Sequence, residues 1–303
     1  LQVRTSRGVR FARCCHRLTM RVGVVMLPAD PWPQAQARAQ HLERLGFAHL
    51  WTYDHLSWRR FRDGPWFGAI PWLTGMAAAT TRIRLGTLVA SPNFRHPVTF
   101  AKDALTLDHL RAGRVTLGIG AGGIGFDATV FGDEVLTPRE RADRLADFLE
   151  VLDGLLSTPT YSSENHRYPV VAAQNIPAPV QQPRIPFLVA AAGPRTLGLA
   201  ARFGQGWVTF GRETDENLAD LEDGLMKQAV ILDEQCERLG RDPADLDRVL
   251  LSSHRLDMST VEQLLGICSR VGMTDLIVHD PRPGDSELDA DPDIMDELAR
   301  MWL

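Results

Sequence analysis

The segment of residues 83–123 places two apolar runs on either side of a helical pattern, and it constrains the fold more than any other feature. The runs Ile83–Ala90 and Arg114–Gly120 consist mainly of apolar and small residues and do not alternate with polar ones. Such runs are typical of parallel strands that are covered on both faces. Pro97 suits the first turn of a helix over Pro97–Leu110. The segment therefore predicts a right-handed strand–helix–strand unit.

The same succession of an apolar run and a helical pattern recurs along the chain. The predicted strands are Val22–Met26, Leu50–Tyr53, Ile83–Ala90, Val115–Gly120, Pro186–Ala191, Trp207–Phe210, Val249–Ser253 and Leu276–His279. The predicted helices are Pro33–Leu45, Trp66–Ala79, Pro97–Leu110, Pro138–Leu156, Arg195–Phe203, Asp215–Leu239, Thr260–Val271 and Pro292–Trp302. Eight such units fit an α/β fold, a closed (β/α)8 TIM barrel, with a doubly wound sheet as the alternative because periodicity does not count strands into a ring. The proline-rich segment 157–184 predicts an irregular insertion or hairpin before the fifth strand.

The first nineteen residues differ in composition from the rest. Five arginines recur there without an acidic residue, and no apolar segment of a secretory signal follows them. We expect residues 1–19 to be a disordered or non-native extension before a start at Met20, with an organellar transit peptide as the alternative. Residues 20–303 are expected to form one barrel domain, since such barrels often have about 250 residues.

Composition narrows the classes of function. The net charge of −5 gives no electrostatic reason for binding nucleic acid or an anionic membrane. No apolar run approaches the ~20 residues that cross a bilayer. The four cysteines, Cys14, Cys15, Cys236 and Cys268, lack metal-site spacing. Reduced thiols in a cytoplasmic protein without a metal site are expected.

In a barrel, functional residues belong at the C-terminal ends of the strands. Asp54 and His55 follow the second predicted strand, and a carboxylate can tune a histidine for acid–base chemistry. The alternative is a histidine that packs at the strand end. Gly193, Arg195 and Thr196 lie where the fifth strand meets its helix. Free N–H groups there could hold a phosphate, although a tight turn without a ligand is the alternative.

The glycines after the fourth strand match a dinucleotide fingerprint only formally. Gly118, Gly120 and Gly123 have GxGxxG spacing, but the next helix start is near Thr137. A Rossmann site needs that helix inside the turn. We therefore expect the small residues here, Gly120 and Gly122 among them, to let the backbone approach a flat ring system.

Several of these motifs together resemble the bacterial luciferase-like (LLM) oxidoreductases, which bind a reduced flavin or deazaflavin. The similar segments are GFAHLWTYDH at 46–55, LGIGAG at 117–122 and the glycine turn at 193–196. The resemblance implies that His55 acts as acid or base beside the ring and that Asp54 orients His55 or the ring. It also implies a non-proline cis peptide at Leu88–Val89, or at Val89–Ala90, that supports the ring, and a cofactor phosphate held by the glycine turn.

The resemblance implies a monooxygenase that uses reduced FMN and O₂ on a small organic substrate. The alternatives are hydride transfer with coenzyme F420 and a non-catalytic flavin-binding relative. A homodimer and a separate flavin or F420 reductase are also implied. Residues 123–126 hold no acid where deazaflavin sugar-phosphate dehydrogenases carry a glutamate, and the register of Asp127 is open.

Other polar residues near the predicted strand ends are weaker candidates. Arg95, His96 and His254 could contact the substrate. Of the tryptophans near the barrel-top loops and early helices, most are expected in the core, while one or two could wall an apolar substrate pocket. These tryptophans are Trp32, Trp58, Trp66 and Trp72.

Overall fold

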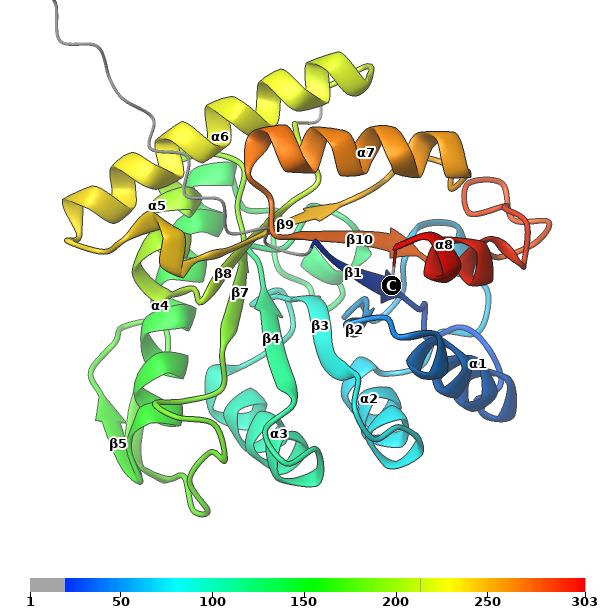
Figure 1. The fold of residues 1–303 in the computed structure, drawn as a ribbon. Helices are drawn as coiled ribbons and strands as arrows, with labels where there is room; N and C mark the ends of the chain where they lie inside the picture. Colours follow the sequence, from blue (N-terminus) through cyan, green and yellow to red (C-terminus); the bar gives the residue numbers. More distant parts are fainter. Residues whose placement is uncertain (1–19, 213, 303) are drawn as a thin grey trace, which may run out of the picture.

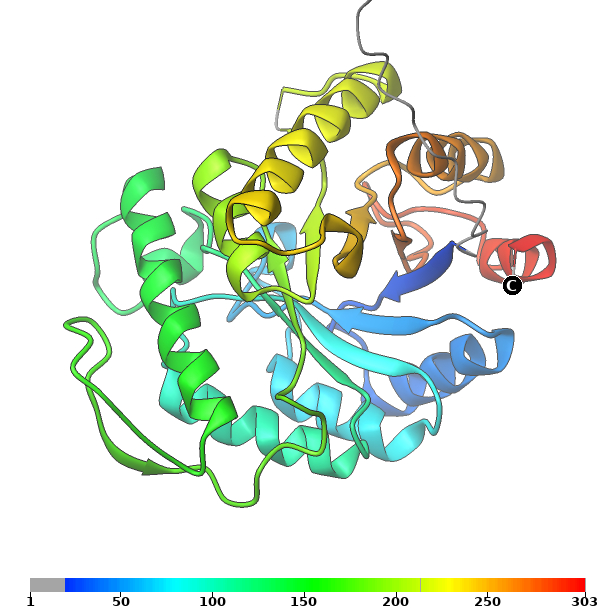
Figure 2. The ribbon, with the colours of Figure 1, turned by 60° about the vertical axis from the view of Figure 1, so that its left-hand side comes forward.

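The centre of the protein is a closed ring of eight parallel strands, seen in the computed structural model that describes residues 20–302 except residue 213 (Figures 1 and 2). Around the ring follow β1 (Arg21–Val25), β2 (His49–Thr52), β3 (Arg84–Ala90), β4 (Val115–Ile119), β7 (Phe187–Ala190), β8 (Gly206–Thr209), β9 (Asp247–Leu251) and β10 (Asp275–His279). The pairing of β1 with β10 closes the ring. The predicted TIM barrel is therefore confirmed, and the doubly wound alternative is wrong. The expected extension over residues 1–19 lies outside the described residues.

Helices surround the strand ring, as Figure 1 shows. They are α1 (Trp32–Leu45), α2 (Ala69–Ala79), α3 (Pro97–Leu110), α4 (Pro138–Ser157), α5 (Pro194–Phe203), α6 (Leu218–Arg238), α7 (Met258–Val271) and α8 (Ile294–Trp302). A capping box between Thr137 and Glu140 fixes the start of α4. Within the described residues, none of the helices is apolar over enough of its length to cross a membrane.

Besides α8, which begins at Ile294 instead of Pro292, two helices begin later than predicted because their expected first residues make other contacts. α2 begins at Ala69, since Trp66 stays in the preceding loop and donates from Nε1 to the His55 carbonyl at 2.9 Å. α6 begins at Leu218, since the Asp215 carboxylate accepts the Arg212 N–H at 2.7 Å. Neither difference moves a strand.

The segment before β7 forms the predicted insertion. β5 (Thr160–Ser163) and β6 (Val170–Gln174) pair as an antiparallel hairpin outside the ring. Figures 1 and 2 both show this green hairpin projecting beyond the helices. It therefore interrupts the strand–helix rhythm without entering the barrel.

Neighbouring residues along a strand belong to two different apolar clusters. Leu276 and Val278 of β10 pack in the large cluster beneath the helices, whereas Ile277 between them packs in a smaller cluster. In β2, Leu50 likewise belongs to the large cluster and Trp51 to the smaller one. Side chains alternate between the two faces of a strand, so the smaller cluster fills the barrel interior. Both faces are apolar, which explains the continuous apolar runs in the sequence.

The N-terminal end of the barrel is closed by a buried polar network. The Asp275 carboxylate accepts from Arg21 Nε at 2.7 Å, and its Oδ1 lies 2.8 Å from His49 Nε2. Trp51 Nε1 donates to His49 Nδ1 at 2.6 Å, so Nε2 carries the proton that His49 donates to Asp275. Burial works to raise the pKa of Asp275, but the hydrogen bonds from His49 and Arg21 lower it to about 2. This end of the barrel is held by charge and hydrogen bonds.

Candidate active site

A cavity of about 490 Å³ opens at the C-terminal ends of the strands. Residues that follow or end β2, β8, β9 and β10 line it, namely Tyr53, Thr209, Leu251 and His279. Cavities of 300–1,000 Å³ with apolar walls and few polar groups are the usual form of small-molecule sites. The cavity lies where the TIM-barrel rule places function.

A distorted part of β3 forms the floor of the cavity. The Leu88–Val89 peptide is cis, and the pairing of β3 with β4 shifts between Thr87 and Ala90. The first of the two expected positions for the cis bond is therefore confirmed. Leu88 and Val89 line the cavity, whereas Ala90 is fully buried and is not among the lining residues.

Glycines of the β4–α4 loop fit closely against this floor. A Cβ at Gly120 would lie 2.6 Å from Val89 Cγ2. Gly122 has a φ of +78°, and a Cβ there would lie 2.5 Å from Asn93 Oδ1. Both glycines line the cavity together with Ala190 and Val208. The result is a flat apolar surface made of small side chains and backbone, as expected from the glycine pattern.

The polar centre of the cavity is His55. Its Nδ1 lies 2.5 Å from Oδ2 of Asp127, whose Oδ1 accepts the Leu56 N–H at 3.0 Å. Asp127 is buried in the short 3₁₀ helix η2 (Phe126–Ala128), so its carboxylate is fixed from two sides. Nδ1–H therefore donates to Asp127, and Nε2 has no hydrogen-bond partner among the described residues. This arrangement leaves one nitrogen of His55 able to exchange a proton with a bound molecule.

Asp54 pairs with Arg95 and not with His55, whereas the resemblance implied that Asp54 orients His55 or the ring. Its carboxylate accepts two hydrogen bonds from Arg95, at 2.9 Å from Nε and 2.7 Å from Nη2, and it is 1% exposed. Neither Asp54 nor Arg95 is among the lining residues. Successive side chains of an extended segment point to opposite sides, so His55 faces the cavity and Asp54 faces away. His55 therefore pairs with Asp127, 72 residues further along the chain, and not with its neighbour Asp54.

A second cavity of about 590 Å³ adjoins the first and shares Gly122, Arg141 and Phe210 with it. Gly193, Arg195 and Thr196 line it at the start of α5. Gly193 is the N-cap and offers no side-chain bond, and no described residue accepts from the N–H groups of Arg195 and Thr196. Nothing lies within 4 Å of a Cβ built on Gly193.

This second cavity has the features of an anion site. Helix N-termini with open N–H groups favour negative charge. Arg139, Arg141 and Arg195 line it, and Arg195 pairs with Asp143. The residues fit a phosphate, and the adjoining floor fits a planar ring.

The three expected substrate residues lie elsewhere: Arg95 pairs with Asp54, and both histidines lie outside the lining. His96 is the N-cap of α3, where Nδ1 accepts the Val98 N–H at 3.3 Å, and its ring packs edge-on against Tyr168. His254 follows β9 but is exposed and outside the lining, where Ser253 stands instead. These residues lie near strand ends in the sequence, but their side chains do not point into the cavity.

Sequence reasoning did not single out Tyr53, which lines the cavity beside His279. Tyr53 and His279 share a 2.6 Å hydrogen bond between Oη and Nε2, and burial raises the pKa of Tyr53. Trp58, one of the tryptophans considered as a pocket wall, lines the cavity with its ring 5.0 Å from that of Tyr53. Tyr53 was within a predicted strand, and its place at the last position was the signal that could have identified it.

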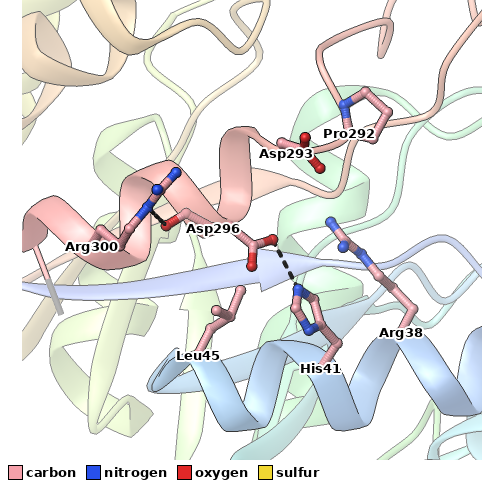
Figure 3. A pocket seen from close by; sticks show the side chains of 7 residues that line it. All are labelled: Arg38, His41, Leu45, Pro292, Asp293, Asp296 and Arg300. Atoms are coloured by element: carbon pink, nitrogen blue, oxygen red, sulfur yellow. Dashed lines mark hydrogen bonds and ion pairs between the residues drawn. The ribbon is translucent and has the colours of Figure 1, made fainter.

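Another cavity, of about 580 Å³, lies outside the barrel between α1 and α8 (Figure 3). Its polar groups already pair with each other, since His41 Nε2 lies 2.9 Å from Asp296 Oδ2. Arg38 pairs with Asp280 at 2.8 Å. The first contact joins α8 to α1 and the second joins α1 to the residue after β10, and we assign both a structural role.

Comparison with known proteins agrees with this geometry. The profile of the family described as luciferase-like monooxygenase matches residues 15–255. The chain belongs to this family. Among relatives in this family, an F420-dependent hydroxymycolic acid dehydrogenase of Mycobacterium tuberculosis is 33% identical over 215 residues, which are 70% of this chain and 56% of that protein. An F420-dependent glucose-6-phosphate dehydrogenase of Kineococcus radiotolerans is 30% identical over 274 residues, 88% of this chain and 77% of that protein.

The match therefore spans little more than half the length of the first relative, and likewise 56% of an F420-dependent glucose-6-phosphate dehydrogenase of Microbacterium testaceum.

Solved structures share the fold at low identity. A monooxygenase of Streptomyces bottropensis has a TM-score of 0.76 at 18% identity, covering 93% of this chain and 98% of its own. An F420-dependent secondary alcohol dehydrogenase has a TM-score of 0.75 at 15% identity, and the match covers 93% of this chain and 98% of that protein.

Proposed function

We propose that this protein is an oxidoreductase that binds coenzyme F420 at the C-terminal end of the barrel and exchanges a hydride with a small organic substrate. The observation that carries the proposal is His55, held by Asp127 above a flat apolar floor that leads to an anion site. The relatives named F420-dependent dehydrogenases support this alternative more than oxygen insertion.

The residues present suit a flavin-type cofactor in two ways. Leu88, Val89 and Gly120 would support the ring, and Gly193 with the N–H groups of Arg195 and Thr196 would hold the phosphate. The bound cofactor supplies the hydride acceptor or donor.

His55 would handle the proton that accompanies the hydride. When an alcohol is oxidised, Nε2 of His55 takes the hydroxyl proton as the carbon-bound hydrogen leaves as hydride and the carbonyl forms. Asp127 keeps the other nitrogen protonated and stabilises the charged ring that results. Carbonyl reduction uses the same groups in reverse.

Monooxygenation with reduced FMN and O₂ stays a prediction of the family resemblance. Its support is the partly apolar lining of the cavity and the description of the family. A homodimer and a separate reductase also stay predictions.

Titrating the purified protein with F420 and with FMN, each oxidised and reduced, tests the proposal. We expect micromolar affinity for F420 from quenching of its fluorescence, and oxygen uptake no faster than free flavin autoxidation. Tight binding of reduced FMN with protein-dependent oxygen uptake would overturn the proposal in favour of the monooxygenase. A non-catalytic relative would bind cofactor, yet His55→Ala would change no turnover.

A further inference from the structure

The cavity has an aromatic wall, where Trp58 lines the cavity and Phe61 and Trp66 pack against Trp58. The ring centroids of Trp58 and Trp66 are 6.0 Å apart, and those of Phe61 and Trp66 are 5.8 Å apart. Trp58, Phe61, Trp66 and Leu288 pack against the apolar cluster of the barrel interior. The apolar surface is thus continuous from inside the barrel to the loop that covers its mouth. It offers a substrate apolar contact on more than one side.

The cations that line this cavity are already engaged. Among the described lining residues, arginine occurs only at Arg59 and Arg141. Arg59 lies 3.7 Å from Glu287 and stacks 4.9 Å over Trp58. Arg141 donates to the Leu136 carbonyl at 2.8 Å and belongs also to the anion site beyond the floor. A phosphate group on the substrate would have to compete for Arg59 with Glu287, whose carboxylate also lines the cavity and would repel it.

Exposed apolar side chains continue past the mouth. Leu56 and Phe126 are 42% and 40% exposed, although they lie where two loops meet. That meeting is fixed by the hydrogen bond from the Leu56 N–H to Asp127 and by Arg62, which stacks 5.3 Å over Phe126. Exposed apolar side chains beside a pocket often mark binding surface.

We infer that the substrate is an uncharged alcohol or ketone that carries an alkyl or aryl chain, and that the chain lies between Trp58 and Leu288. This inference rests on the proposed function. Alcohol oxidation balances as described: the hydride passes to oxidised F420, the hydroxyl proton to His55, and a ketone remains. The substrates of this protein are therefore distinct in class from sugar phosphates.

The experiment compares propan-2-ol, hexan-2-ol, decan-2-ol and glucose 6-phosphate with the full chain and oxidised F420. Loss of F420 absorbance is expected with the alcohols, with kcat/KM rising about three- to fourfold per added methylene over the first carbons. No turnover is expected with glucose 6-phosphate. Independently of F420, quenching of tryptophan emission by ketones should show a Kd that falls with chain length.

Leu288→Asn tests the wall directly. We expect its KM for decan-2-ol to rise about tenfold and its KM for propan-2-ol to change little, because only the longer chain reaches residue 288. Leu239→Asn is the matched control, since Leu239 is 53% exposed at the end of α6 and is not among the residues that line the cavity.

The outcomes separate this inference from the proposed function. If F420 binds but glucose 6-phosphate is turned over, or chain length has no effect on kcat/KM or on ketone Kd, the inference is wrong and the F420 proposal stands. If F420 does not bind but ketone affinity still rises with chain length, the apolar substrate class stands and the cofactor proposal fails. If neither binding is seen, both fail.

Discussion

The His55 Nδ1 and Asp127 Oδ2 atoms are 2.5 Å apart, although the two residues are separated by 72 positions in the chain. The contact brings the loop after β4 against the end of β2 and fixes which histidine nitrogen faces the cavity. Asp127 is therefore a positioning residue for His55 in the proposed reaction.

Asp127→Asn should lower kcat about 100-fold while leaving F420 affinity within about twofold, because an amide does not hold the required tautomer or stabilise the charged ring. The pH profile of kcat/KM should shift as well, which a purely structural role would not cause. Steady-state kinetics and fluorescence titration measure both quantities.

Asp133→Asn is the control for that variant, since Asp133 is exposed in the same loop. Unchanged kinetics in Asp127→Asn, with the fold intact by circular dichroism, would remove His55 and Asp127 from the mechanism.

Gly120→Ala should weaken cofactor binding about tenfold and lower the free energy of unfolding by about 1–3 kcal/mol. The added Cβ would lie 2.6 Å from Val89 Cγ2 and displace the floor. Gly125→Ala in the same loop is the matched control, because nothing lies within 4 Å of its Cβ. Equal affinities of the two variants for F420 would contradict a ring site on this floor.

Arg95→Leu should lower the free energy of unfolding by about 3–5 kcal/mol, because it leaves the buried Asp54 carboxylate without its partner. F420 affinity of the folded variant should change little. Arg255→Leu is the control, since Arg255 is exposed and 3.8 Å from Asp289. Urea unfolding measures the difference, and a large loss of cofactor binding with normal stability would return Asp54 and Arg95 to the site.

The pKa of Asp275, lowered to about 2 in the folded state, predicts acid sensitivity. The unfolded carboxyl has a pKa of about 3.9, so the stabilisation is complete above pH 4 and is lost as the pH falls through 2. It amounts to about 2–3 kcal/mol. Asp275→Asn should lower the free energy of unfolding at pH 7 by at least this amount. Between pH 4 and 2, its free energy of unfolding should change less than that of the parent protein.

Asp247→Asn is the comparison for Asp275→Asn, because Asp247 also pairs with Arg21 but its side chain is 51% exposed. Asp247→Asn should lower the free energy of unfolding at pH 7 much less than Asp275→Asn does. Equal pH dependence of unfolding in Asp275→Asn and the parent would rule out Asp275 as the source of acid sensitivity.

Much of the fold followed from local patterns. Apolar runs such as residues 115–120 predicted strands because both faces of a barrel strand are buried. Thr137 and Pro138 marked a helix start that the capping box confirms. The cis peptide at Leu88–Val89 came from the family resemblance and not from any local pattern, since an ordinary buried strand has the same residues.

The sequence alone determined the order of the eight strand–helix units and the place of His55 at a strand end, because periodicity and burial act over a few residues. Only the tertiary structure decided which carboxylate meets His55. Asp54 is adjacent in sequence but turns away with the alternation of the strand and pairs with Arg95, whereas Asp127 is brought in by a loop of another strand. Side-chain direction at a loop depends on contacts between distant segments, and these arise only when the ring closes.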